Sequence, residues 1–282
     1  MKNQYLKLMF FSSLMAAMCV SCNTKNAEQS TEAESVAQRN DWEELELKGK
    51  VKEVTIKEYR AHEAFGELQK DDLLWSRQYQ FTADGMLSMS LRGQGTSEYD
   101  LIATYTYSDN ERLIEYQGTQ SGKEITTYTN SGDIKRVTLY NADGIEYQRK
   151  EYTYNEKNQL VEVAYYSKDN GLYRIMEYIY DAAGHVYKEK AKETNGEIDK
   201  EYHYAYDEQG RKIREEKYNG DGAMQNVKIY SYDKEGNIAT IFDENQKICE
   251  YTYQYDSKGN YTEAYYKSRT YCSIAERTIV YY

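Results

Sequence analysis

The chain repeats a short tyrosine-rich unit. Tyr-x-Tyr pairs begin at Tyr152, Tyr178, Tyr204 and Tyr230, each 26 residues after the one before. A glycine, replaced once by Asn158, lies four residues beyond each pair, and a second turn signal falls in the other half of each unit. Self-similarity at a fixed period indicates a repeat architecture. Two turns per unit leave two strands of about eight residues each.

The turns define how the strands should pair. In Asp-x-x-Gly, aspartate suits the first position of a type I turn, and glycine supplies the left-handed residue that closes a three-residue hairpin loop. In this register the second tyrosine of a pair faces the residue two beyond the glycine, and aromatic rings opposite apolar residues are favourable. Tyr206 is the exception, because it faces Lys212. The expected pairs are Phe81–Leu87, Tyr128–Ile134, Tyr154–Leu160, Tyr180–Val186, Tyr232–Ile238 and Tyr255–Tyr261.

Copies of the unit extend from Tyr79 to Tyr282, which gives about 17 strands. Twisted open sheets rarely exceed about ten strands, so a meander of this length must coil or close. The absence of proline fits continuous pairing, because proline would remove a ladder donor. The sequence therefore predicts an all-β fold: an antiparallel meander of 26-residue, two-stranded repeats, forming a coiled single sheet, an open spiral or a loose barrel.

The repeat domain is expected to occupy residues 42–282, with clear repeats over 79–282. Residues 49–56 are rich in β-formers, and we expect them to form an opening strand that caps the array. The spacing from Gly49 to Gly85 exceeds one period, which indicates an insertion. Because residues 60–75 are polar and acidic, we expect a loop there, with a short helical turn as the alternative.

The N-terminus indicates export. In residues 1–21, Lys2 and Lys7 precede an apolar run that is typical of a signal peptide and too short for a spanning helix. Ser21 before Cys22 resembles the lipobox of bacterial lipoproteins, which implies cleavage before Cys22 and lipid on its sulfur; simple secretion is the alternative. Residues 22–41 are expected to be the lipidated cysteine and a flexible tether. We therefore expect a protein anchored by lipid to the bacterial cell envelope, at the outer membrane or cell surface.

The charge argues against one class of partner. Without Lys2 and Lys7 of the leader, 34 basic and 47 acidic residues remain, a formal charge of −13. An acidic surface disfavours nucleic acid and disfavours charge-driven binding to anionic lipid. The chain has 33 tyrosines but five phenylalanines and two tryptophans, which indicates a thin amphipathic sheet whose hydroxyls reach water.

No catalytic constellation is visible, so we expect neither an enzyme nor a metal or cofactor site. His62, His185 and His203 are not at metal-ligand spacing, and His203 should lie on the face opposite the tyrosines. Cys249 and Cys272 map too far apart for a ready disulfide. The repeated turn aspartates are expected to cap turns rather than bind calcium; they are Asp181, Asp207, Asp233 and Asp256.

The tyrosine face is the one feature with functional promise. We expect Arg214 opposite Tyr204 and Lys188 opposite Tyr178. Two interpretations remain: the face is the interior of the coiled sheet, or it is a stacking platform for sugars or an extended partner. The candidate binding face consists of Tyr152, Tyr178, Tyr204 and Tyr230.

The segment Tyr204-Ala205-Tyr206-Asp207-Glu208-Gln209-Gly210-Arg211 resembles the YD-repeat motif of Rhs-type proteins, as do residues 178–184, 230–237 and 253–259. The resemblance covers about residues 79–282. It implies a secreted or surface-exposed β-sheet spiral, which in large members is a shell around a toxic cargo, and a role in carbohydrate binding or cell contact. Because the repeats are few and Tyr282 is on the last strand, we expect a small YD-repeat lipoprotein without cargo.

These observations predict a non-enzymatic envelope lipoprotein that acts as a binding scaffold for a glycan or a protein partner. The alternative is a structural or assembly accessory of the envelope without a small ligand.

Overall fold

A computed structural model describes residues 41–94, 98–108, 111–116, 121–169, 171–243 and 246–282. The predicted signal peptide, the predicted lipidation at Cys22 and the predicted tether up to residue 40 lie outside the described residues.

Within the described residues, eighteen antiparallel strands follow one short helix, α2 (Asp41–Glu44). The strands are β1 (Val51–Ala64), β2 (Glu67–Phe81), β3 (Leu87–Gln94), β4 (Glu98–Ser108), β5 (Glu111–Tyr116), β6 (Gly122–Tyr128), β7 (Ile134–Asn141), β8 (Glu146–Tyr154), β9 (Leu160–Ser167), β10 (Gly171–Tyr180), β11 (Val186–Lys192), β12 (Ile198–Tyr206), β13 (Lys212–Asn219), β14 (Met224–Tyr232), β15 (Ile238–Asp243), β16 (Gln246–Tyr255), β17 (Tyr261–Ser268) and β18 (Cys272–Tyr281).

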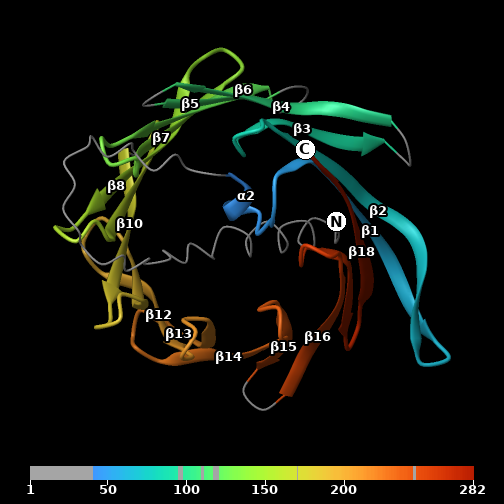
Figure 1. Ribbon diagram of the computed structural model, residues 1–282. Coiled ribbons are helices and arrows are strands. Elements are labelled where there is room, and N and C mark those ends of the chain that lie inside the picture. The colour runs from blue at the N-terminus through green and yellow to red at the C-terminus, as the bar shows by residue number, and fades with distance from the viewer. Residues whose placement is uncertain (1–40, 95–97, 109–110, 117–120, 170, 244–245) are drawn as a thin grey trace, which may run out of the picture.

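The sheet closes on itself into a barrel (Figure 1). Each strand pairs with its neighbours in sequence, and β1 also pairs with β18, from Val51 opposite Tyr281 to Ala61 opposite Cys272. The predicted all-β meander is confirmed, and of the expected closures the barrel is the one formed. The expectation that the opening strand caps the array is wrong, because β1 is paired on both sides and closure removes the sheet edge there.

The turns have the predicted chemistry. At the end of β12 the Gly210 amide donates to the Asp207 carbonyl (3.0 Å), and the Asp207 amide donates to the Arg211 carbonyl (3.0 Å). Gly210 has φ +76°, and Asn158 takes the same left-handed conformation at φ 60°. The Asp207 carboxylate accepts the Arg211 amide at 2.8 Å, so this aspartate caps its turn as expected.

The predicted register is confirmed at each tested turn, including the exception of Tyr206 opposite Lys212. One more residue is extruded from the returning strand directly after each of these pairs, so the ladder shifts by one. The confirmed pairs are Phe81–Leu87, Tyr128–Ile134, Tyr154–Leu160, Tyr180–Val186, Tyr232–Ile238 and Tyr255–Tyr261.

Residues 60–75 are strand apart from the two-residue turn at Phe65 and Gly66, so the expected loop and its helical alternative are both wrong. They belong to a long hairpin in which β1 and β2 pair up to Ala64 opposite Glu67, and its far end extends beyond the ring of the barrel (Figure 1). The acidic composition led to the wrong expectation, because polar residues on both faces hide the alternation by which a half-buried strand is identified.

The main apolar core lies beneath α2, which is inside the ring (Figure 1). The Trp42 indole packs against Phe81 with ring centroids 6.4 Å apart, and its Nε1 donates to the Val51 carbonyl at 2.7 Å. Val54 and Leu47 complete the buried cluster. These contacts identify the face of β1 and β2 that points inward. Directly paired residues share a face, so the inner face can be followed from strand to strand around the barrel.

The outer face is polar and carries ion pairs along successive strands. Each of these charged residues alternates with an inward-facing one, and several bridge neighbouring strands. Representative pairs are Lys188–Glu201 (3.0 Å), Arg214–Glu216 (2.7 Å) and Arg136–Glu151 (2.8 Å).

Candidate functional site

The four tyrosines predicted as a binding face all point into the barrel. Tyr152 is on β8, Tyr178 on β10, Tyr204 on β12 and Tyr230 on β14. Each is half-buried rather than buried. An eighteen-stranded barrel is wider than opposing side chains can fill, so these rings line an inner wall that solvent reaches. Of the two interpretations made from the sequence, the structure places this face in the interior.

The residues opposite these tyrosines differ from the expectation. Glu215, not Arg214, faces Tyr204, because the extra residue extruded after the Tyr206–Lys212 pair shifts the ladder by one. The same shift places Glu189 opposite Tyr178 and directs Lys188 outward. The register expected from the sequence included the bulged glycine but not this second extra residue. The inner wall therefore combines tyrosines with carboxylates at positions where cations were expected.

Tyr204 and Tyr230 form one cluster with a lysine and a glutamate. The Lys212 ammonium lies 4.8 Å from the Tyr204 ring centroid and 5.3 Å from that of Tyr230. It also pairs with the Glu215 carboxylate at 2.7 Å, which accepts the Tyr230 hydroxyl at 3.3 Å. A cation held over two ring faces and paired with a carboxylate is a stable arrangement.

The tyrosine hydroxyls of this cluster stay protonated. Burial, together with the charges of Glu189 and Glu215, raises the pKa of Tyr204 far above its ordinary value of 10. The same causes, with Glu215 as the neighbour, raise the pKa of Tyr230. Burial also raises the pKa of Glu189, which hydrogen-bonds to Tyr204. The inner wall therefore presents neutral hydroxyl donors and ring faces beside carboxylate acceptors.

The second tyrosine of each pair has a different role. Its hydroxyl donates a hydrogen bond to a backbone carbonyl of the preceding repeat. This carbonyl lies beyond the last described backbone pair between the two strands. Each bond spans twenty residues of sequence: Tyr154 to Ile134 (2.8 Å), Tyr180 to Leu160 (2.7 Å), Tyr206 to Val186 (2.6 Å) and Tyr232 to Lys212 (2.6 Å). These hydroxyls give hydrogen-bond donors to carbonyls that lie beyond the described ladder.

A second inner cluster lies near the closing strands. The Arg277 guanidinium sits 3.5 Å from the Tyr261 ring centroid, and burial lowers the pKa of Arg277. Nearby, buried Glu58 accepts the Trp75 indole N–H, and burial raises the pKa of Glu58. Sequence reasoning missed this cluster, because it forms only when the first and last strands meet.

A third cluster anchors α2 to the wall. Asp41 is buried, and its carboxylate accepts the Leu87 amide at 2.6 Å and the Tyr107 hydroxyl at 2.7 Å. The Arg112 guanidinium approaches the same carboxylate at 3.9 Å and Glu124 at 3.8 Å. Removing a partner from such a buried charge pair is strongly destabilising, so we assign this cluster a structural role.

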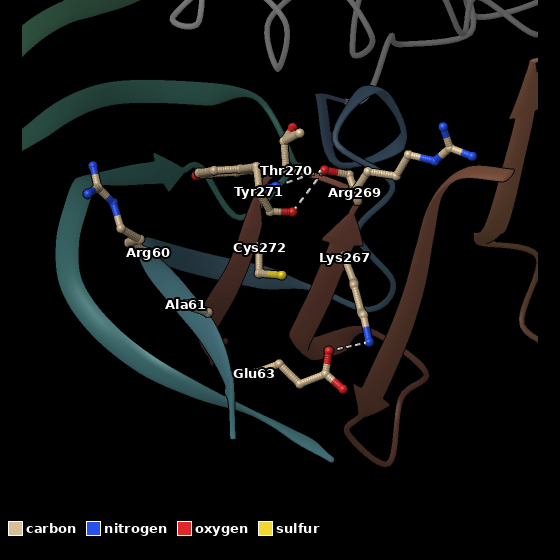
Figure 2. A pocket seen from close by; sticks show the side chains of 9 residues that line it. Arg60, Ala61, Glu63, Lys267, Arg269, Thr270, Tyr271 and Cys272 are labelled. Atoms are coloured by element: carbon tan, nitrogen blue, oxygen red, sulfur yellow. Dashed lines mark hydrogen bonds and ion pairs between the residues drawn. The ribbon is translucent and has the colours of Figure 1, made fainter. Parts of the chain in front are cut away.

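An open cleft of about 570 Å³ lies at the rim, between β1 and the β17–β18 turn (Figure 2). Lys267 and Glu63 form an ion pair across it at 2.5 Å. The turn is held by the Ser268 hydroxyl, which donates to the Tyr271 carbonyl at 2.9 Å. No sequence pattern indicates this cleft, because its lining comes from residues 60–63 and 267–272, which are far apart in the chain.

The remaining candidates are dispersed. His203 lies on the outer face, as predicted, beside Glu201. Cys249 and Cys272 are free thiols. Within the described residues, no group of three or more histidine, cysteine, aspartate or glutamate side chains is arranged to hold a metal ion. No helix in the described part of the chain is long and apolar enough to cross a membrane.

No family model and no curated protein matches this chain. Similar solved structures include a porin-like protein from Bacteroides uniformis ATCC 8492, with 13% identity over 82% of this chain and 98% of that chain (TM-score 0.46). A porin-like protein from Bacteroides vulgatus ATCC 8482 shares 11% identity over 82% and 98% (TM-score 0.36). TcdB2-TccC3-TEV shares 10% identity over 76% of this chain and 13% of that chain (TM-score 0.41).

Proposed function

We propose that this chain is a non-enzymatic binding scaffold of the bacterial cell envelope that takes up carbohydrate on the inner wall of its barrel. The observation that carries the proposal is the cluster of Tyr204, Tyr230 and Glu215. It places two half-buried tyrosine rings, each with one face covered by the Lys212 ammonium, beside a carboxylate on a wall that solvent reaches.

Carbohydrate suits this chemistry better than other small ligands. A sugar ring has apolar C–H faces that stack on tyrosine, and its hydroxyls are donors that carboxylates accept. Ligand sites combine aromatic surface with a few polar groups that fix orientation. The 26-residue period repeats a tyrosine on the inner face at Tyr152, Tyr178, Tyr204 and Tyr230, which suits an extended chain of repeating sugar units.

We propose binding without catalysis. Glu215 is paired with Lys212, and Glu189 is hydrogen-bonded to Tyr204, so both carboxylates are engaged in orienting neighbours. A glycosidase needs one carboxyl group held ready to protonate a leaving group and a second free to act as nucleophile or base. The engagement of both carboxylates favours a scaffold over an enzyme.

The proposed envelope location rests on the leader, and the outer wall favours a barrel that is not itself embedded in lipid. Lipid on Cys22 would tether the barrel to a membrane through residues 22–41. A wall that faces lipid needs a continuous apolar band, whereas the outer wall here carries ion pairs such as Lys188–Glu201 and Arg214–Glu216. The proposed arrangement is a barrel in water, held at an outer-membrane or cell surface by its lipid.

We also propose that the chain is a small relative of the YD-repeat proteins. Its Tyr-x-Tyr-Asp-x-x-Gly segments form three-residue hairpin loops with a left-handed glycine, as at Asp207–Gly210, and the units curl into one sheet. Both features support common descent with the spiral shells of that class.

The test is a glycan array probed with the exported chain and two inner-wall variants. Tyr204→Ala and Tyr230→Ala should each lower the signal roughly tenfold or more, as truncation of a central aromatic contact does. Tyr187→Ala is the matched control, because Tyr187 is an exposed tyrosine outside this cluster. Loss of signal in the control, or no glycan bound by the unaltered chain, would contradict the proposal.

The second candidate is an assembly accessory of the envelope without a small ligand. The hairpin that extends beyond the ring favours it, since the barrel does not need this extension to close. A stable envelope partner captured by crosslinking, together with an empty glycan array, would select this alternative.

A further inference from the structure

The hairpin of β1 and β2 extends beyond the strands that pair with it. The pairing of β18 with β1 ends at Cys272 opposite Ala61, and the described pairing of β2 with β3 begins at Arg77. Between these limits the hairpin is held by its own ladder, up to Ala64 opposite Glu67. A two-stranded ribbon that leaves its sheet presents free edges, which proteins use for pairing with other chains.

The tip of this hairpin carries a residue that the turn does not favour. Phe65 and Gly66 form a two-residue loop with φ 55° and 84°, as in a type I′ turn. Asparagine or aspartate normally fills the first position, and a bulky residue at positive φ is an outlier. Phe65 is also fully exposed. An aromatic ring that costs both backbone strain and exposure indicates a contact made elsewhere.

A complementary receptor lies where the same hairpin leaves β18. The rim cleft has a volume of about 570 Å³, which exceeds that of a phenyl ring. Its charged lining consists of Arg60, Arg269 and the Lys267–Glu63 ion pair, which leaves it net positive. Ala61, Tyr271 and Cys272 form other parts of its walls. The tip carries the exposed Glu67, whereas Glu63 is engaged with Lys267 in the cleft. An apolar ring beside an acid therefore matches a cleft whose border is net basic.

We propose that two copies of this chain associate through their hairpins, with Phe65 of each copy seated in the rim cleft of the other. The tip lies just beyond the cleft on the same hairpin, so a two-fold axis that sets the two hairpins side by side in opposite directions satisfies both contacts at once. The acidic flanks disfavour an anionic lipid surface as the occupant of the tip. This dimer is independent of what the inner wall binds.

The native Cys272 in the cleft provides the test. Phe65→Cys is introduced into the full-length chain, which is crosslinked in its membrane under mild oxidation and separated without reductant. The dimer predicts a band at twice the chain mass that disappears when Cys272→Ser is added. Met224→Cys, another exposed apolar residue on the barrel, is the matched control and should give no dimer. A Phe65→Cys dimer that persists with Cys272→Ser, or no dimer, would overturn the proposal.

A second measurement leaves the thiols untouched. Phe65→Ser should weaken self-association, measured by sedimentation of the full chain in detergent, by roughly tenfold or more, as loss of a central aromatic contact does. Glu67→Arg should also weaken self-association, and adding Arg269→Glu to the same chain should restore self-association. The two-fold contact would be refuted if the unaltered chain sediments as a monomer at every concentration. It would also be refuted if the Glu67→Arg, Arg269→Glu double variant does not recover self-association.

Discussion

The Tyr206 hydroxyl donates a hydrogen bond of 2.6 Å to the Val186 carbonyl, twenty residues earlier on the neighbouring repeat. The pairing of β11 with β12 stops at Lys188 opposite His203, so this carbonyl is beyond the described ladder between them. One side chain of each unit thus completes the backbone of the preceding unit. This relationship explains why the second tyrosine of each pair recurs and separates its role from that of the first.

Removing this hydroxyl should destabilise the barrel. Tyr206→Phe leaves the Val186 carbonyl without its donor, and we expect a loss of about 1 kcal/mol in the free energy of unfolding. Urea unfolding followed by circular dichroism measures it. Tyr187→Phe, on an exposed tyrosine, should change stability by less than about 0.5 kcal/mol. Equal effects in the two variants would argue against the inter-repeat bond.

The turn glycines should differ in how they tolerate alanine. Gly210 and Gly236 have φ of +76° and +95°, so alanine at either position costs about 1 kcal/mol from the left-handed backbone. At Gly210 the new Cβ would also lie 3.0 Å from the His185 ring, which stacks on Tyr206, whereas Gly236 faces open space. The midpoint temperature of thermal unfolding should therefore be lower for Gly210→Ala than for Gly236→Ala. The reverse order would contradict the described packing.

Two glutamates on opposite faces should respond to pH with opposite sign. Burial raises the pKa of Glu189 above 4.5, so the folded chain holds this proton more tightly than the unfolded chain. The free energy of unfolding therefore falls as pH rises from 4.5 to the raised pKa. Hydrogen bonds from Tyr218 and Arg214 lower the pKa of Glu216, so its contribution is present above 4.5 and is lost as pH falls through the lowered value.

The variants Glu189→Gln and Glu216→Gln test these signs. Relative to the unaltered chain, Glu189→Gln should gain stability as pH rises from about 4 to about 8, and Glu216→Gln should lose stability as pH rises from about 3 to about 5. Urea unfolding at a series of pH values gives both differences. Parallel trends in the two variants would show that the inner carboxylate is not desolvated.

The helix α2 should hold the wall through Asp41. Asp41→Ala removes the acceptor of the Leu87 amide and the Tyr107 hydroxyl and leaves Arg112 without one of its two carboxylates. We expect a loss of about 3 kcal/mol, as for a broken buried charge pair. Glu43→Ala, on the exposed side of α2, is the control and should stay within about 0.5 kcal/mol. A small effect at Asp41 would mean that α2 is dispensable.

Local features of the fold were predictable from the sequence, because a hairpin is decided by neighbouring residues. The turn chemistry at Asp207–Gly210 set the loop, and the opposition of Tyr180 and Val186 followed from it. Closure was not predictable in this way. Pairing of β1 with β18 joins the two ends of the repeat region, and nothing in either segment alone specifies that partner.

The inner wall was only half predictable. Periodicity placed Tyr178 and Tyr204 on one face, yet the extra residue after each turn has no sequence signature, so Glu189 and Glu215 were missed as their neighbours. A shift of one residue exchanges the two faces of a strand, which is why this small irregularity changed the expected charge of the wall.

Closure of the barrel is the claim on which the inner wall depends, and a disulfide across the seam tests it most directly. Thr55 on β1 lies directly opposite Thr278 on β18. In a chain carrying Thr55→Cys and Thr278→Cys, mild oxidation should join the two cysteines within one copy, seen by mass spectrometry of the non-reduced digest from the monomer band. Two free thiols after oxidation, or joining only between copies, would show that β1 and β18 do not meet.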